Sequence, residues 1–498
     1  MSRLLGSVPV YPVALAVAPV LATYVESDAS VATITRPLLV ATTLAVVLTV
    51  AGARVVQSRH LGGVAAVASL IALRASAIAQ LAWLVLLVVA VAMVVRWLRR
   101  YLTVDFAAHR ITPAGNLVGG VLLLIIAISA MVNGTVARAI DDLTRVTAVR
   151  APPASDELPD IHILLFDSYP RADVLGRVFA HDNSEFFEGL EARGFDVSDR
   201  SRSNYANTAN TLASVFNMAH LPDLDVDHQS TRRLIQESPA LDIARRLGYV
   251  IHANQAPWDN VTLRSADVLC GSALPTDFEL HLLSRTVLHD LLATIVPETD
   301  GTERFAAYTD TAFECLADSA TSPELVLSIN HFPVPHLPLV FDRHGDLVSE
   351  ELAGEEVDDL SVPFSRIAPA YREQLAYLNR RTLEAVDDAI AAAGDETVVV
   401  VMSDHGPESS LREDYVDAPD VHERFTNLFA ARTPGRTDLF GDAATTVNLF
   451  PGLFNAYLDT DLPEQRPSLF SPVEPFSGIE RFDELPNPDV SAQSRRSQ

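Results

Sequence analysis

The sequence predicts an α/β sandwich with a mostly parallel central sheet, preceded by an all-α transmembrane region of about five helices. Long apolar stretches fill the first 135 residues. The rest of the chain alternates short, continuously apolar segments with amphipathic ones, which is typical of buried parallel strands joined by helices. We expect a transmembrane region at 1–135, a linker at 136–158, a water-soluble domain at 159–472 and a tail at 473–498, disordered from about 483.

Four apolar stretches make up the expected membrane region. A spanning helix needs roughly 20 mostly apolar residues, and the stretch 61–97, interrupted only by Arg74, can hold two. No span has an acidic residue in its middle, which argues against a transporter or a proton relay. The expected spans are about 4–24, 37–56, 61–76, 77–97 and 116–135.

The distribution of arginine orients these spans. With five spans, Arg36 and Arg74 fall on one side and the other arginines of the membrane region fall on the opposite side. The positive-inside rule places the arginine-rich side in the cytoplasm. The chain after residue 136 is then expected outside the cytoplasmic membrane. A four-span alternative would place Arg99, Arg100 and Arg110 outside, which the same rule disfavours.

The charge of the chain is divided between its two parts. Residues 1–150 hold 12 Arg against 5 acidic residues, and residues 151–498 hold 25 Arg against 59 acidic residues, which together give the net charge of −27. An acidic soluble part argues against nucleic acid as a partner, because phosphate backbones bind basic patches. There are two cysteines, Cys270 and Cys315, which form either a disulfide in an extracytoplasmic domain or two separate buried thiols.

Three nearly continuous apolar segments of the soluble part are expected to be buried parallel strands. Each of them stops at a residue that can carry chemistry: IHILLF at Asp167, ELVLSIN before His331, and TVVVVMS at Asp404 and His405. Ligands of such sheets bind beyond the carboxyl ends of the strands, so we expect these side chains to gather there. The apolar segments lie at 161–166, 324–330 and 397–403, and amphipathic helices are expected within 184–194, 231–248 and 370–394.

Two motifs suggest a chemistry for this edge of the sheet. In SDHG, Asp404 and His405 can both reach one divalent ion, and Gly406 lets the chain turn sharply. The alternative is an Asp helix cap beside a surface His. The segment 201–218 (SRSNYANTANTLASVFNM) is rich in hydroxyl and amide groups before it becomes apolar like the start of a helix. A Thr or Ser at a helix N-terminus suits nucleophilic attack on a phosphoryl group, whereas the alternative is a capped turn.

These motifs, taken in order, resemble the sulfatase-like domain of the alkaline phosphatase superfamily. The segments that carry the resemblance are DSYPRADVL, DNSEFFEGLEARGF, SRSNYANT, LASVFNM, HFPVPHLPLVFDRHG and SDHGPES. A polytopic front end followed by this domain is similar to lipoteichoic acid synthases and phosphoethanolamine transferases. The resemblance covers about 158–472 and, more loosely, the membrane region. It implies an alkaline-phosphatase-like α/β sandwich and a hydrolase or transferase that acts on envelope lipid or glycan.

The resemblance implies a role for individual residues. One divalent cation (Mn, Mg, Ca or Zn) would be bound by Asp167, Thr208, Asp404 and His405, with no other cofactor, and Thr208 would also be the nucleophile. Thr208 is preferred over Thr211 because the family pattern has a Ser six residues after its nucleophile, as Ser214 is here. His336 would contact the transferable group of the substrate. His331 and His422 are weaker candidates for the same pocket.

The sequence also departs from the family pattern. Sulfatases use a Cys or Ser in C/S-x-P-x-R, whereas Thr208 is followed by Ala-Asn-Thr, so hydrolysis of a sulfuric ester by that route is in doubt. Ser168 stands where many members have a second Asp, and Asn330 stands in the stretch that corresponds to a second metal site, which favours one metal over two. A catalytically inactive ectodomain that binds envelope components is the alternative from another class.

Overall fold

The computed structural model describes most of the chain and divides it into two compact units. The first unit comprises Met1–Val146 with Pro275–Glu298, and the second comprises Thr147–Leu274 with Thr299–Gln498. The domain boundaries expected from the sequence stay predictions, and nearly all of the expected linker lies outside the described residues. The described ranges are 8–27, 31–73, 104–132, 135–136, 158–224, 231–271, 276–284, 286, 301–348, 364–407, 421–472 and 482–485.

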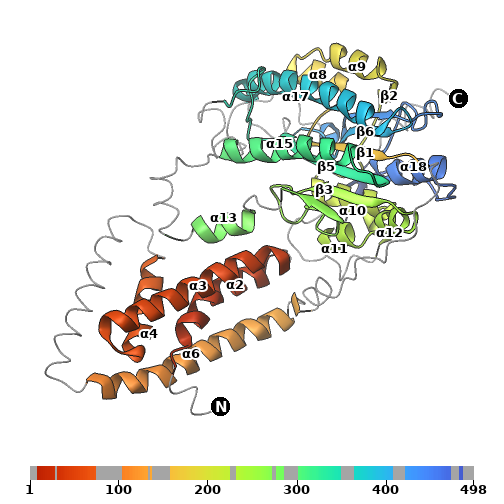
Figure 1. The fold of residues 1–498 in the computed structure, drawn as a ribbon. Helices are drawn as coiled ribbons and strands as arrows, with labels where there is room; N and C mark the ends of the chain where they lie inside the picture. The colour runs from red at the N-terminus through yellow and green to blue at the C-terminus, as the bar shows by residue number, and fades with distance from the viewer. Residues whose placement is uncertain are drawn as a thin grey trace. The chain divides into compact units, whose positions relative to one another are not determined.

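The first unit is entirely helical where it is described (Figure 1). By length and composition, Thr33–Val56 and Ile111–Val132 could cross a membrane, and Tyr11–Val25 and Arg59–Ile71 are shorter apolar helices. The expected span 77–97 lies outside the described residues, so the number of spans stays a prediction. The helices are α2 (Tyr11–Glu26), α3 (Val31–Val56), α4 (Arg59–Leu73), α6 (Val104–Val132) and α13 (Asp277–Ser284).

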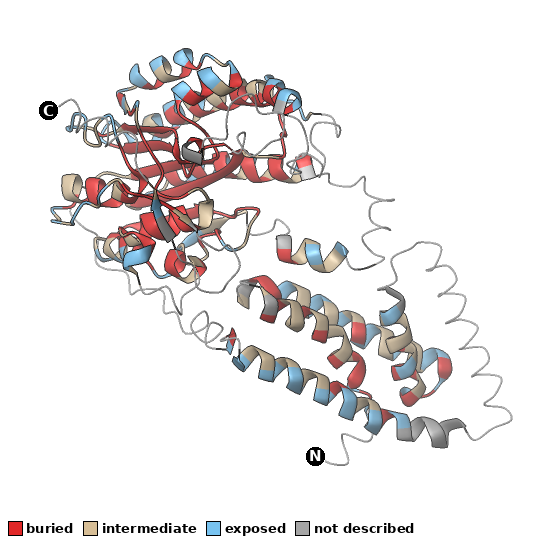
Figure 2. Ribbon diagram, turned by 180° about the vertical axis from the view of Figure 1, so that it is seen from behind, coloured by how far each residue is buried: buried red, intermediate tan, exposed pale blue. Residues whose placement is uncertain are grey.

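Small residues allow two of these helices to pack closely. A Cβ added at Gly62 of α4 would lie 2.5 Å from the backbone nitrogen of Ala53 in α3. Helix α6, by contrast, exposes large apolar side chains such as Leu117, Ile125 and Met131, and Figure 2 shows many of its residues as exposed. An apolar surface of this kind is expected to face lipid or a partner rather than water.

Helix α13 comes from the soluble part of the sequence but packs within the helical unit. Phe278 joins an apolar cluster with Val20, Tyr24 and Ile34, and Arg36 of α3 forms a two-point ion pair with Glu279. Nothing in the sequence pattern sets this short helix apart from its neighbours.

The second unit is built on a seven-stranded, mostly parallel sheet with the order β2-β7-β6-β1-β5-β3-β4. Strand β1 pairs in parallel with β5 and β6, and β3 pairs in parallel with β4 and β5, whereas β7 is antiparallel to β2 and β6. This confirms the expected α/β class with a mostly parallel sheet. The strands are β1 (Ile161–Asp167), β2 (Phe195–Val197), β3 (Val250–Asn254), β4 (Val268–Cys270), β5 (Val326–Pro335), β6 (Val398–Ser403) and β7 (Phe429–Arg432).

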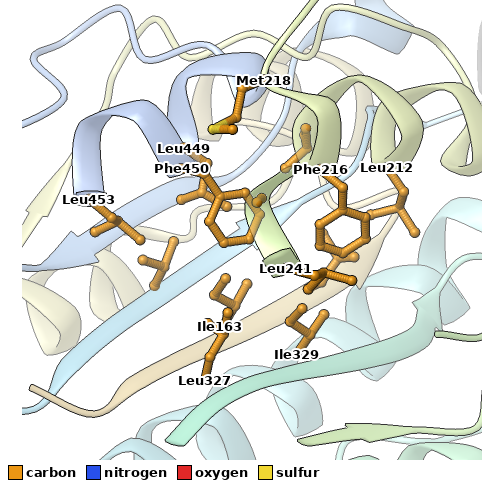
Figure 3. Packing of buried hydrophobic residues seen from close by; sticks show 14 of the residues in the cluster. Ile163, Leu212, Phe216, Met218, Leu241, Leu327, Ile329, Leu449, Phe450 and Leu453 are labelled. Atoms are coloured by element: carbon orange, nitrogen blue, oxygen red, sulfur yellow. The ribbon is translucent and has the colours of Figure 1, made fainter. Parts of the chain in front are cut away.

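Alternate side chains of β1 enter two cores, because successive residues of a strand point to opposite faces of the sheet. Ile163 packs under α10 (Thr208–Asn217) and α18 (Leu449–Tyr457), where Figure 3 shows it among Phe216, Phe450 and Leu327. Leu164 and Phe166 enter the core on the other face. The central strands β1, β3, β5 and β6 are buried over their whole length, and Figure 2 shows buried residues along the middle of the sheet. Helices α8 (Ala172–Phe179), α9 (Ser184–Glu191), α15 (Gly301–Ala320) and α17 (Phe364–Ala393) cover that second core.

The structure corrects three expectations about individual segments. The helix expected over 231–248 is two helices, because Pro239 disfavours a helical conformation at Ser238. Strand β5 continues to Pro335, so His331 lies inside the strand and not after its end. The disorder expected from 483 is wrong for 483–485, which belong to a strand; residues beyond 485 are outside the described ones. These elements are α11 (Thr231–Gln236), α12 (Pro239–Arg246), β8 (Leu469–Pro472) and β9 (Phe482–Leu485).

The remaining described elements are short. They include the 3-10 helices η1 (Leu221–Asp223), η4 (Val421–Phe425) and η5 (Thr446–Asn448).

Cys270, at the end of β4, forms a disulfide with Cys315 of α15, with the two Cα atoms 6.0 Å apart. Of the two alternatives for the cysteines, the structure therefore has the disulfide, which is typical of proteins outside the cytoplasm.

Candidate metal site and nucleophile

Two chain segments meet at the carboxyl ends of the central strands. Asp167 is the last residue of β1, and Asp404 and His405 follow β6 directly. Because β1 and β6 are parallel neighbours with Phe166 opposite Ser403, these side chains leave the sheet at the same level. The ligand atoms of Asp167, Asp404 and His405 all lie within 4.8 Å of one another and are buried. The structure thus brings together three of the four predicted metal ligands.

The two oxygens of the Asp404 carboxylate have different surroundings. Oδ1 accepts hydrogen bonds from the backbone N–H of Ser168 (3.1 Å) and of His405 (2.7 Å). Oδ2 is buried, and no residue in the described part of the chain donates a hydrogen bond to it. A buried carboxylate oxygen without a donor is costly unless a cation binds it. The arrangement therefore fits a metal ion at Oδ2.

The imidazole of His405 turns the lone pair of its Nε2 toward the two carboxylates. Its Nδ1–H donates to the carbonyl oxygen of Gly406 over 2.8 Å, which fixes the tautomer and leaves the lone pair on Nε2. Nε2 lies 3.4 Å from Asp404 Oδ2 and 3.7 Å from Asp167 Oδ1. Burial lowers the pKa of His405, so the ring is neutral at pH 7 and these contacts are not ion pairs. Two carboxylates and a neutral imidazole form a ligand set that suits a divalent cation.

The hydroxyl of Thr208 lies beside this cluster. Thr208 is the first residue of α10, and its Oγ1 is 3.4 Å from Asp167 Oδ2. Asn207 precedes it as the N-cap and accepts a hydrogen bond from the backbone N–H of Asn210. The positive end of the helix dipole therefore lies at Thr208, where it would stabilise a bound anion.

The other candidate nucleophile occupies a structural position. Thr211 is fully buried, and its hydroxyl pairs with Ser203 Oγ at 3.1 Å and with the carbonyl oxygen of Tyr205 at 3.4 Å. Ser214, six residues after Thr208, donates to the carbonyl oxygen of Ala219 near the end of α10. Between the two threonines, the contacts of Thr208 are those that favour a role in the site.

The three candidate histidines differ in position. His331 Nε2 lies 3.9 Å from Asp167 Oδ2, and neither of its ring nitrogens has a hydrogen-bond partner among the described residues. Burial lowers its pKa to about 4. His336 is half-buried, its Nδ1–H donates to the carbonyl oxygen of Leu337, and its ring packs edge-on against Trp258. His422 belongs to η4, but its side chain lies outside the described part of the structure.

Backbone contacts fix the loops that carry the ligands. Ser168 has a left-handed backbone conformation (φ 61°), which turns the chain after Asp167 and directs its N–H at Asp404. Gly406 is needed for a different reason from the sharp turn expected of it. A Cβ at Gly406 would lie 2.2 Å from the carbonyl oxygen of Glu423, so glycine permits the close approach of two backbone segments.

Two side chains near the site have no strong signal in the sequence. The sequence indicates His331 only weakly, through its position five residues before His336. The pairing of β5 with β1 directs the His331 side chain at Asp167. Arg424 of η4 was not a candidate at all. Its guanidinium donates to the carbonyl oxygen of Ala206, and its charge contributes to the lowered pKa of His405.

Comparison with known proteins gives similarity to solved structures at low sequence identity. No protein-family model matches the chain, and neither does any curated protein sequence. The zinc complex of the periplasmic domain of EptC from Escherichia coli is 14% identical, with 66% of this chain and 96% of that chain covered and a TM-score of 0.44.

Two further structures represent an integral membrane protein and a sulfatase. The lipooligosaccharide phosphoethanolamine transferase EptA from Neisseria meningitidis is 14% identical, with 90% of this chain and 95% of that chain covered and a TM-score of 0.39. The 2-O GAG sulfatase BT1596 is 15% identical, with 62% and 72% covered and a TM-score of 0.39. Phosphoethanolamine transferases and a sulfatase are thus among the proteins to which this chain is similar.

Proposed function

We propose that this chain is a metal-dependent ester transferase or hydrolase of the sulfatase and alkaline-phosphatase-like superfamily, with Thr208 as its nucleophile. The observation that carries the proposal is one cluster at the sheet edge. The donor atoms of Asp167, Asp404 and His405 lie within 4.8 Å of one another, and the Thr208 hydroxyl is 3.4 Å from Asp167. The family resemblance of the sequence motifs implies the same four residues.

Each residue of the site has its own role in the proposed reaction. A bound divalent cation would supply Lewis acidity that lowers the pKa of a coordinated hydroxyl and neutralises charge on the transferred group. Asp167 accepts the hydrogen bond of Thr208 and so directs the attacking oxygen. Attack of Oγ1 on phosphorus forms a Thr208–phosphate ester and releases the first alcohol; a second alcohol or water then takes the group from Thr208. His336 would contact the equatorial oxygens or protonate the leaving alcohol.

A phosphoester is the favoured substrate, and the site is proposed to face the cell envelope. Thr208 lies outside the C/S-x-P-x-R motif on which sulfatases depend, which favours phosphoryl over sulfuryl transfer. The apolar helices Thr33–Val56 and Ile111–Val132 and the Cys270–Cys315 disulfide support a multi-pass protein of the cytoplasmic membrane with an extracytoplasmic catalytic domain. Membrane lipid or envelope glycan is then the accessible substrate.

Replacement of Thr208 tests the proposal directly. Thr208→Ala should lower the turnover of aryl phosphate or phosphonate esters by more than about 1,000-fold, since covalent catalysis needs the hydroxyl. Thr321→Ala removes an exposed hydroxyl at the end of α15 and is the matched control. Mass spectrometry of the quenched wild type should locate phosphate on Thr208. Full activity of Thr208→Ala would eliminate Thr208 as the nucleophile, and absence of bound divalent metal would favour an inactive binding module.

A further inference from the structure

The segment 421–428 contacts each of the three loops that build the candidate site. Its backbone accepts a hydrogen bond from Gly406, through the carbonyl of Arg424 at 2.7 Å, and from Ser203, through the carbonyl of Phe425 at 2.8 Å. The N–H of Leu428 donates to the carbonyl oxygen of Tyr169 at 2.9 Å. These partners lie in the loop after β6, in the segment before α10 and in the loop after β1. The segment therefore connects the metal ligands to the turn that holds Thr208.

Arg424 makes the most direct of these connections. Its side-chain Nε donates to the carbonyl oxygen of Ala206 over 3.1 Å, and Nη2 donates to the same oxygen. Ala206 stands two residues before Thr208. One residue thus holds the nucleophile turn with its guanidinium and the loop of Asp404 and His405 with its backbone carbonyl.

The guanidinium also brings a permanent positive charge close to the ligand cluster. Arg424 is half-buried. Its charge adds to burial in lowering the pKa of His405. Arginine is charged at any working pH, and its planar fork keeps a fixed geometry when two of its N–H groups share an acceptor. Lysine offers a point charge without this fork, so the two residues are not equivalent here.

We propose that Arg424 is the positioning residue for the nucleophile: by holding the carbonyl of Ala206 it fixes Thr208 Oγ1 beside Asp167, while its backbone fixes the metal-ligand loop at Gly406. The proposal rests on the function proposed above, because Thr208 is the group it positions. Displacement of a reacting group by about 1 Å can cost about 100-fold in rate. The metal ligands have their own backbone contacts, such as Ser168 to Asp404, and do not depend on the guanidinium.

Three variants of the full chain in detergent test this role. Arg424→Gln should lower kcat for an aryl phosphate ester about 100-fold while KM changes less than about threefold. A displaced Thr208 hydroxyl slows the chemical step but leaves the contacts that bind the substrate in place. Arg424→Lys keeps the charge without the fork and should recover less than about a tenth of the lost rate. Arg200→Gln, which removes an exposed arginine paired with Asp442, is the matched control and should keep wild-type kcat.

Two readouts separate positioning from general damage. The affinity for Mn²⁺, measured by calorimetry without substrate, should change less than about tenfold in Arg424→Gln, because Asp167, Asp404 and His405 keep their places and only the Thr208 hydroxyl shifts. Hydrogen exchange at the amides of residues 205–209 should become faster in Arg424→Gln, while exchange in β6 stays as in the wild type. Unchanged kcat in Arg424→Gln, or a parallel loss of Mn²⁺ affinity, would overturn the role.

Failure of the positioning role of Arg424 can be told apart from failure of the proposed function. If the wild type turns over no phosphate or sulfate ester, the enzymatic proposal fails by itself. Hydrogen exchange then decides the role of Arg424: faster exchange at 205–209 in the Gln variant supports the contact with Ala206 as what holds the turn, and unchanged exchange overturns it.

Discussion

Replacing Asp404 with Asn should make the metal-free protein more stable and remove its response to divalent cations. Asp404 and Asp167 are buried, and their ligand oxygens lie within 4.8 Å of each other and of the neutral imidazole of His405. Two like charges at that distance repel by about 3 kcal/mol at an effective dielectric constant of about 20. Asn keeps the oxygen that accepts from Ser168 and His405, and its amide carries no charge. The variant therefore loses the repulsion without losing the backbone contacts.

Metal binding offsets most of this stability difference in the wild type. A ligand at about 100 times its Kd stabilises the state that binds it by about 2.7 kcal/mol. Urea unfolding of the full chain in detergent, with EDTA or with a MnCl₂ series, measures both effects. We expect Asp404→Asn to unfold at higher urea than the wild type in EDTA and to show no shift with Mn²⁺.

An exposed carboxylate provides the matched control. Asp388 lies on the solvent side of α17, so Asp388→Asn removes the same charge away from the cluster and should follow the wild type in both conditions. A loss of stability of Asp404→Asn in EDTA would refute the repulsion argument. A Mn²⁺ response that survives in this variant would refute the assignment of Asp404 as a ligand.

Two further predictions concern stability away from the site. The Cys270–Cys315 disulfide closes a loop with a sequence separation of 45, so the double Cys→Ser variant should unfold about 4 kcal/mol more easily; a loss below about 1 kcal/mol in urea unfolding would contradict this. Burial lowers the pKa of His162, on β1, to about 4 from 6.5. The native state therefore resists protonation, and about 3 kcal/mol of stability present above pH 6.5 should be lost as the pH falls toward 4. His162→Gln should flatten this dependence, exposed His344→Gln should not, and equal pH profiles for His162→Gln and wild type would refute the reasoning.

The regular parts of the soluble fold could be predicted from the sequence because they follow from local chemistry. The continuously apolar segments became β1 and β6, with bounds within one residue of those expected, and the helix at 370–394 ends where Gly394 adopts a positive φ of 97°. The break at Pro239 is also local, because proline disfavours a helical conformation of the residue before it. The end of β5 could not be read in this way, because pairing with β1 extends the strand through His331 to Pro335.

The sequence by itself determined which residue types stand at the ends of the central strands, and it thereby indicated Asp167, Asp404 and His405. Thr208 was implied by the family resemblance, at the expected start of a helix. Only the tertiary structure decided which atoms meet. Periodicity cannot distinguish Thr208 from Thr211, which differ by the partners that packing gives them. It also cannot place Arg424 against Ala206, 218 residues away along the chain, since such a contact depends on how strands far apart in sequence are ordered in the sheet.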